Sequence, residues 1–264
     1  MNLFLLNPTA KRARLKDKII NYLNHLKVPG EFIEVKKKED LTKILNEALE
    51  KKIENIVIVG GDGMVNRVIQ LIAKRRINLG VIPIGETNLL ANILGINDWK
   101  KGCEVLTKPK VVSMNLGIIS GEKYFTSSIE IEGKEQKKEK VFGIFSKREK
   151  KRYYPTTLSV VGDHSKFKLQ VNMSSLIITT IPVPLPKNFK IEDYTDDQEL
   201  KVIIKSKPEN KSRFEEITTI KARKIDIESK GSLYIKADGE HSGKASVNIE
   251  ISPKCLNVIV PEEK

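Results

Sequence analysis

The chain has 264 residues, of which 39% are hydrophobic and 31% charged, and its formal net charge is +13. This length suits one large domain or two smaller ones. No apolar run approaches the roughly 20 residues that span a bilayer, and the stretch Leu3–Leu6 is too short for a signal-peptide core. Cys103 and Cys255 have no metal-ligand spacing, so we expect buried, reduced thiols in a cytoplasmic protein.

Residues 1–109 alternate between short apolar runs and segments with helical spacing of apolar residues. The expected strands are 2–6, 32–35, 56–59 and 79–83, and helices are expected over 14–27, over 39–52 and from about residue 65. Strands that alternate with helices in this way form a parallel sheet covered on both faces. Ligands bind at the carboxyl ends of such strands. We therefore predict an α/β domain with its site on that rim.

Residues 110–254 have a different pattern, with many short β-rich runs separated by glycine-containing breaks. Several runs alternate between apolar and polar residues, as in Phe167–Val171. This pattern predicts an all-antiparallel second domain, either a sandwich or a barrel. Pro182, Pro184 and Pro186 predict an extended connector within it.

A glycine-rich turn, Gly60-Gly61-Asp62-Gly63, follows the third expected strand and precedes a helix. Glycines let the backbone approach an anion closely, and the N–H groups of a helix start point toward it. A tight turn with no ligand explains the glycines equally well. Asp62 favours the phosphate interpretation, because a carboxylate beside phosphate suggests Mg²⁺ between them.

Other polar residues follow the same strand ends. They are Asn7 and Thr9 after the first strand, Asn66 in the helix after the third, and Gly85, Glu86, Thr87 and Asn88 after the fourth. In the second domain, Asp238-Gly239-Glu240 read alone is a hairpin turn, since Asp-Gly is a preferred type I′ pair.

The order and spacing of these motifs resemble the diacylglycerol kinase catalytic-domain family, which includes bacterial lipid kinases and sphingosine kinases. The resemblance covers essentially the whole chain. The Gly60-Gly61-Asp62-Gly63 turn is also similar, more distantly, to that of NAD kinases. The family resemblance implies an N-terminal α/β domain (1–109) with a Rossmann-like parallel sheet of the NAD-kinase and lipid-kinase type. It also implies an all-β antiparallel sandwich (110–254), with a last strand at about 255–264 that returns to the first domain.

The resemblance also implies an activity and its residues. The expected reaction is phosphoryl transfer from ATP, with Mg²⁺, to a hydroxyl of a diacylglycerol-like or related membrane lipid. The residues implied to hold phosphate and nucleotide are Asn7, Thr9, Gly60, Gly61, Asp62, Gly63, Asn66, Gly85, Glu86, Thr87 and Asn88, with Asp62 as the metal ligand. Asp238 would be the general base, and Glu240 would assist it or bind metal.

The chain departs from the family pattern at several of these positions. Met64 replaces a threonine, Arg67 replaces an acidic residue, and Leu89 and Asn92 replace an aspartate and a basic residue. Thr87 could supply the missing hydroxyl and Glu86 the missing carboxylate. Three hypotheses therefore stay open: an active lipid kinase, a weakened relative that binds nucleotide or lipid in a regulatory role, and a basic nucleic-acid-binding protein.

The excess positive charge is concentrated in Lys134–Arg152, which has nine basic residues, three acidic ones and an apolar centre. Such a segment suits an anionic membrane surface, nucleic acid, or a loop with no partner. Aromatic residues make up only 6% of the chain, and no nucleic-acid recognition motif is present. We therefore expect no nucleic-acid partner, and a lipid substrate met peripherally at the inner face of the membrane.

Overall fold

The computed structural model describes residues 1–8, 13–36, 38–133, 152–181, 198–208, 215–231, 233–244 and 246–262. The chain divides into two compact units. The first comprises Met1–Leu116, Pro184–Gln198 and Ser252–Lys264, and the second comprises Gly117–Val183 and Glu199–Ile251. The first division falls inside one long strand, β5 (Lys110–Ile119), rather than after residue 109.

The first unit contains the α/β pattern that the sequence predicts. Its strands are β1 (Asn2–Leu6), β2 (Gly30–Glu34), β3 (Asn55–Gly60) and β4 (Asn78–Pro83). Its helices are the 3₁₀ turn η1 (Ala13–Leu15), α1 (Lys16–His25), α2 (Lys38–Glu50), α3 (Asp62–Ile72), α4 (Leu89–Ile93) and α5 (Trp99–Val105). Each predicted strand and helix corresponds to one of these elements, with ends that differ by a few residues.

The sheet of the first unit has the order β2-β1-β3-β4-β15, and β15 (Val247–Val260) brings the C-terminal part of the chain beside β4. All these pairs are parallel. Asn55 donates to Asn2 and Asn78 donates to Asn55 through their side-chain amides, at 2.9 and 2.8 Å. This asparagine ladder joins the amino-terminal ends of β1, β3 and β4, so these strands also end together at the opposite rim.

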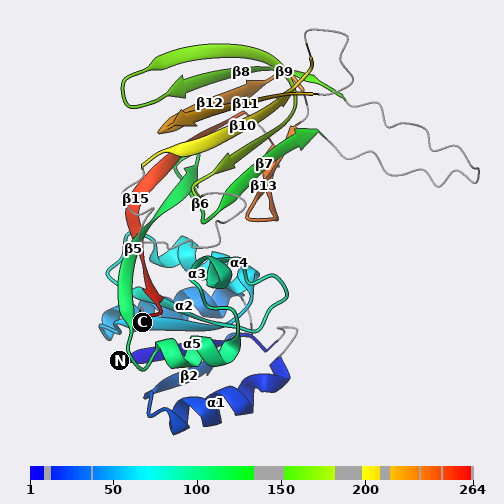
Figure 1. Ribbon diagram of the computed structural model, residues 1–264. Coiled ribbons are helices and arrows are strands. Elements are labelled where there is room, and N and C mark those ends of the chain that lie inside the picture. The colour runs from blue at the N-terminus through cyan, green and yellow to red at the C-terminus, as the bar shows by residue number, and fades with distance from the viewer. Residues whose placement is uncertain are drawn as a thin grey trace, which may run out of the picture. The chain divides into compact units, whose positions relative to one another are not determined.

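Helices cover both faces of this sheet (Figure 1). Helix α1 packs against α5, where the Tyr22 hydroxyl donates to Glu104 at 3.0 Å and the Tyr22 ring meets Trp99 edge-on. Helices α2 and α3 pack together on the other face. The central strands carry near-continuous buried apolar residues, such as Ile56–Val59, because a parallel sheet has no solvent-exposed face.

The second unit is an antiparallel β structure. Its strands, besides parts of β5 and β15, are β6 (Lys123–Phe125), β7 (Ser128–Gly133), β8 (Tyr154–Val161), β9 (Lys166–Thr179), β10 (Leu200–Ser206), β11 (Glu216–Ala222), β12 (Lys224–Ser229), β13 (Leu233–Ala237) and β14 (Glu240–Lys244).

The structure corrects three details of the strand assignment. The sequence has two separate β-rich runs, 166–173 and 175–181, which predict two strands, but β9 continues through both as far as Thr179. The single β-rich run 217–227 divides into β11, which pairs with β10, and β12, which pairs with β8 and β15, with Arg223 between them. Strand β14 was not expected, since its sequence EHSGK has no apolar alternation.

One long strand organises the core of the second unit. The first half of β9 pairs with β8, and its second half lies between β7 and β10. The alternate residues that point inward from these strands, such as Leu158, Leu176, Ile178 and Ile204, form one buried apolar cluster with those of β12 and β13. Burial of this cluster supplies the main stabilisation of the unit.

Both cysteines are free and buried. Burial raises the pKa of the Cys103 thiol to about 12 and also raises the pKa of Cys255. Within the described ranges, the structure contains no helix long and apolar enough to cross a bilayer.

Candidate functional site

The predicted nucleotide residues of the first unit meet at the carboxyl ends of β1, β3 and β4. Asn7 follows β1 and donates its N–H to the Val59 carbonyl of β3 at 3.0 Å. Ile84 follows β4 and donates its N–H to the Gly60 carbonyl, also at 3.0 Å. A Cβ added at Gly60 would lie 3.4 Å from the Asn7 Cβ. The turns after these three strands therefore form one continuous rim.

Two glycines bring the turns after β3 and β4 into direct backbone contact. A Cβ built on Gly61 would lie 3.0 Å from the Gly85 Cα, and one built on Gly85 would lie 2.7 Å from the Gly61 Cα. Real Cβ atoms do not approach backbone as closely as 2.7 Å, so Gly85 requires glycine for steric reasons, whereas a Cβ at Gly61 would force the facing turn to shift by a few tenths of an ångström. The two turns form a single surface of backbone atoms, next to the first turn of α3.

Asp62 is the first residue of α3, and its side chain binds the other turn. Its Oδ1 accepts the N–H of Leu89, the first residue of α4, at 2.6 Å. A short hydrogen bond from an N–H at a helix start to a carboxylate is charge-assisted and also favoured by the helix dipole. Asp62 therefore performs for α4 the role that an N-cap side chain usually performs.

Asn88 occupies the N-cap position of α4, but its side chain does not cap the helix. Asn88 has a left-handed backbone with φ of 51°, and no capping bond from its side chain is formed. Its Oδ1 accepts the Gly85 N–H at 2.9 Å, and its Nδ2 donates to the Gly85 carbonyl at 3.1 Å. This reciprocal pair closes the second turn on itself and fixes the position of Gly85 opposite Gly61.

The remaining predicted residues of the rim differ in exposure. Glu86 and Thr87 are exposed, and Asn66 is half-buried within α3. The Thr87 carbonyl accepts the side-chain amide of Asn92 at 2.8 Å. Asn92, which occupies the family's basic position, thus braces the turn. Thr9 lies outside the described residues.

Two departures from the family pattern have clear structural positions. Met64 is 4% exposed, and a Cβ at Gly60 would meet its sulfur at 3.4 Å, so its side chain belongs to the core under the turn. Arg67 is exposed one helical turn further along α3. The phosphate turn therefore has a hydrophobic support at position 64, and the exposed Thr87 hydroxyl lies on the neighbouring turn.

In the second unit, Asp238 and Glu240 lie in the hairpin between β13 and β14, where Ala237 pairs with Glu240. Asp238 and Gly239 have φ of 48° and 81°, as the two central residues of a type I′ turn require. The hairpin that this sequence predicts when read alone is thus present. The Glu240 side chain is exposed.

The Asp238 carboxylate anchors a neighbouring segment. One oxygen accepts the Thr126 N–H at 2.7 Å and the Thr126 hydroxyl at 2.9 Å, and the other accepts the N–H groups of Ser127 and Ser128 at 2.8 and 3.1 Å. An ionised carboxylate has about four acceptor positions. The four donors occupy these positions, so one donor would have to move for Asp238 to accept a proton from another group.

Sequence reasoning missed the segment that Asp238 anchors. Thr126 and Ser127 are 2% and 4% exposed, and the buried Thr180 hydroxyl donates to the Thr126 carbonyl at 2.7 Å. A signal was present in the sequence, because Thr126-Ser127-Ser128 is a hydroxyl-rich break just before an alternating run. Nothing in that signal identified the distant aspartate as its partner.

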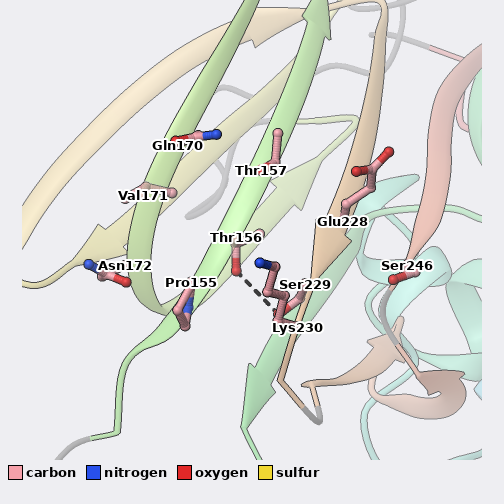
Figure 2. A pocket seen from close by; sticks show the side chains of 10 residues that line it. All are labelled: Pro155, Thr156, Thr157, Gln170, Val171, Asn172, Glu228, Ser229, Lys230 and Ser246. Carbon is pink, nitrogen blue, oxygen red and sulfur yellow. Dashed lines mark hydrogen bonds between the residues drawn. The ribbon is translucent and has the colours of Figure 1, made fainter.

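A depression of about 660 Å³ lies on the second unit, away from its predicted residues (Figure 2). The residues that line it are Pro155, Thr156, Thr157, Gln170, Val171, Asn172, Glu228, Ser229, Lys230 and Ser246. Thr157 pairs with Gln170 on one side and with Glu228 on the other, and Figure 2 shows these side chains on three neighbouring strands. We assign it no role in the candidate site.

Among the described residues, no group of three or more His, Cys, Asp or Glu side chains lies close enough together to hold a metal ion. Mg²⁺ that accompanies a nucleotide is commonly held by one or two carboxylates together with phosphate oxygens. Asp62 and Glu86, both on the rim, have the right chemistry for that arrangement.

Comparison with known protein families decides how this rim should be interpreted. Residues 2–119, which contain the entire rim, match the diacylglycerol kinase catalytic domain. Residues 200–260 match the YegS C-terminal NAD kinase beta sandwich-like domain. By these two matches the chain is similar to the diacylglycerol kinase catalytic-domain family. The predictions of this family, of an α/β domain and of a β-sandwich are thus confirmed.

Individual relatives agree with this assignment. The chain is 26% identical over 259 residues to a diacylglycerol kinase of Bacillus subtilis (strain 168), covering 85% of this chain and 84% of the relative. It is 28% identical over 125 residues to a diacylglycerol kinase of Staphylococcus carnosus (strain TM300), covering 45% and 40%. The crystal structure of a diacylglycerol kinase from Bacillus anthracis (strain Sterne) shares the fold, with a TM-score of 0.72, 21% identity and coverage of 98% and 96%.

Proposed function

We propose that this family member is an ATP-dependent lipid kinase that phosphorylates a hydroxyl of a diacylglycerol-like or related membrane lipid. The observation that carries the proposal is the contact between Gly61 and Gly85 at the start of α3. At this contact the backbone of two glycines has no side chain of its own to cover it, inside the segment that matches the catalytic domain. Backbone of this kind suits the close approach of phosphate groups.

In this proposal the first unit binds the nucleotide. The N–H groups at the start of α3, with Gly60 and Gly63 beside Gly61, face the phosphates, and Asn7 and Asn88 line the site next to them. Mg²⁺, when bound, would neutralise charge on the phosphates, with the carboxylates of the rim on the protein side. Phosphoryl transfer depends on positioning and charge neutralisation, which a rigid rim supplies.

The second unit is proposed to act on the acceptor lipid. Asp238 and Glu240 are the carboxylates that would take the proton of the hydroxyl. The Asp238 carboxylate already accepts from four donors, whereas the exposed Glu240 is accessible in the structure as it stands. The lipid class rests on the Bacillus subtilis relative, which is named a diacylglycerol kinase.

We propose that the protein acts as a peripheral protein at the cytoplasmic face of a membrane. The basic segment 134–152 is the feature that supports it, and apart from Arg152 it lies outside the described residues. Vesicles that contain anionic lipid should bind the intact protein more strongly than a version without this segment, and the difference should shrink as salt is raised. Equal binding would remove the segment from the proposal.

The activity is tested with ATP labelled at its γ-phosphate, Mg²⁺ and a bacterial lipid extract. Label should enter the organic phase, and chelation of Mg²⁺ should prevent this. Asp238→Asn and Glu240→Gln should each reduce labelling, while Glu228→Gln, which changes an exposed carboxylate elsewhere on the second unit, should not. If the wild-type protein transfers no more label than a sample without protein, the kinase proposal fails.

A weakened, nucleotide-binding member of the family is the second candidate. The buried Met64 in place of a hydroxyl and the fully occupied Asp238 carboxylate favour it. Losing one hydrogen bond to a charged phosphate costs about 1.5–3 kcal/mol, which slows transfer without abolishing it. Thermal stabilisation by ATP in a protein that transfers no label would establish this second function.

A further inference from the structure

We infer that Asp62 is a positioning residue that joins the two halves of the phosphate surface, and that this role outweighs any contact of its carboxylate with Mg²⁺. This inference rests on the proposed nucleotide function and specifies how its site is built. It assigns a task to a side chain that the sequence singled out only as a metal ligand.

The first argument comes from connectivity. The turn after β3 and the turn after β4 belong to separate segments of the chain. The two residues that the hydrogen bond joins, Asp62 and Leu89, are 27 positions apart in the sequence. Backbone contact between Gly61 and Gly85 and the hydrogen bond from the Ile84 N–H to the Gly60 carbonyl join the beginnings of the two turns, but neither of them holds the far end of the second turn, at Leu89. The 2.6 Å bond from the Leu89 N–H to the Asp62 Oδ1 adds a directional, charge-assisted link beside this contact.

The second argument comes from the way α4 begins. Its N-terminal N–H groups need acceptors, and the side chain of its N-cap residue Asn88 is turned back to Gly85. Asp62 supplies the acceptor for Leu89. Removal of the Asp62 side chain would therefore leave the start of α4 without this acceptor and would free the second turn to move away from the first.

The two roles of Asp62 respond differently to one conservative change. Asparagine has nearly the same shape, and its Oδ1 can still accept the Leu89 N–H, but it has no charge and is a poor ligand for Mg²⁺. Alanine removes both functions. If positioning dominates, asparagine should rescue the site. If metal binding dominates, asparagine should be as damaging as alanine.

The test measures ATP binding by the full-length protein without lipid, at several Mg²⁺ concentrations, by titration calorimetry. We expect Asp62→Ala to weaken ATP binding roughly tenfold or more, equivalent to about 1.4 kcal/mol. The affinity of Asp62→Asn for ATP should remain within about threefold of the wild-type affinity. The Mg²⁺ concentration that gives half of the full effect on ATP binding should be the same in both proteins. A loss in Asp62→Asn equal to that in Asp62→Ala, or a large shift in its Mg²⁺ requirement, would overturn the inference.

The control variant is Asp98→Ala. Asp98 is the N-cap of α5 and accepts the N–H groups of Lys100 and Lys101 at 2.8 and 3.0 Å. Its loss removes a helix-capping aspartate of the same unit that takes no part in the candidate site. We expect Asp98→Ala to lower thermal stability while leaving ATP binding unchanged. Weakened ATP binding in this control would mean that loss of any helix cap disturbs the site, which would contradict a specific role for Asp62.

A second readout does not depend on nucleotide at all. Hydrogen exchange at the Leu89 amide should be faster in Asp62→Ala than in the wild type, and close to wild type in Asp62→Asn. Wild-type protein that binds no ATP but shows this exchange pattern would refute the proposed function while supporting the positioning role. Unchanged exchange at Leu89 in Asp62→Ala would refute the positioning role itself.

Discussion

Replacing Asp238 with alanine should destabilise the second unit, whatever part this residue plays in catalysis. The substitution removes the acceptor of three backbone N–H groups and one hydroxyl, all within Thr126–Ser128. Two of these residues, Thr126 and Ser127, are almost fully buried, so water cannot easily replace the carboxylate. Ser128 is half-buried, and its N–H can be rehydrated more readily.

The magnitude follows from the two buried N–H groups. A buried donor left without an acceptor costs about 1–3 kcal/mol, and neighbouring losses are not fully additive. We therefore expect Asp238→Ala to lower the free energy of unfolding by roughly 2–4 kcal/mol, which corresponds to a fall in melting temperature of roughly 4–16 °C for a chain of this size. Asp238→Asn keeps one oxygen acceptor and should cost less.

Two measurements check this expectation. Circular dichroism melting reports the loss of stability, and hydrogen exchange locates it, because the amides of Thr126–Ser128 should lose protection in the variant. The matched control is Asp226→Ala. Asp226 lies in the same unit and is half-buried, but its carboxylate is bonded by a single side-chain donor, Asn248, at 2.6 Å. We expect its change in stability to be below that of Asp238→Ala.

The reasoning would be refuted if Asp238→Ala melted like the wild type and its Thr126–Ser128 amides stayed protected. If the expected loss is found, the absence of lipid phosphorylation in Asp238→Ala alone does not identify a general base. Comparison with Asp238→Asn, at a temperature where both variants are folded, then separates chemistry from stability.

Two further predictions concern the first unit. Gly85→Ala places a Cβ 2.7 Å from the Gly61 Cα and 2.8 Å from the Asn88 Oδ1, so it should abolish thermal stabilisation by ATP. Gly162→Ala, whose Cβ would meet a rotatable hydroxyl at 2.9 Å, should keep this stabilisation. A response to ATP in Gly85→Ala would contradict the proposed phosphate surface. Burial raises the pKa of Cys103 from 9.0 to about 12, so the neutral thiol contributes stability that is full below pH 9 and is lost as the pH rises toward 12. Cys103→Ala should show a shallower fall in stability across this range, and an equal slope would refute the burial argument.

Much of the first unit could be predicted because its signals are local. Apolar runs such as Ile56–Val59 and the helical spacing of Val65, Val68, Ile69 and Ile72 depend only on neighbours in sequence. In the second unit, local signals gave the strand class but misplaced several ends, because β9 and β15 run through positions where local propensity changes. Strand pairing overrides propensity at such positions.

The sequence by itself determined the fold class, the family and the rim on which Asn7, Gly61 and Gly85 lie, since strand ends and glycine turns are encoded in short stretches. Only the tertiary structure decided what the carboxylates do. Asp62 meets Leu89 across 27 positions, and Asp238 meets Thr126 across 112. Hydrogen bonds need atoms within about 3 Å in a defined direction, and no periodicity in a sequence specifies that geometry for residues so far apart.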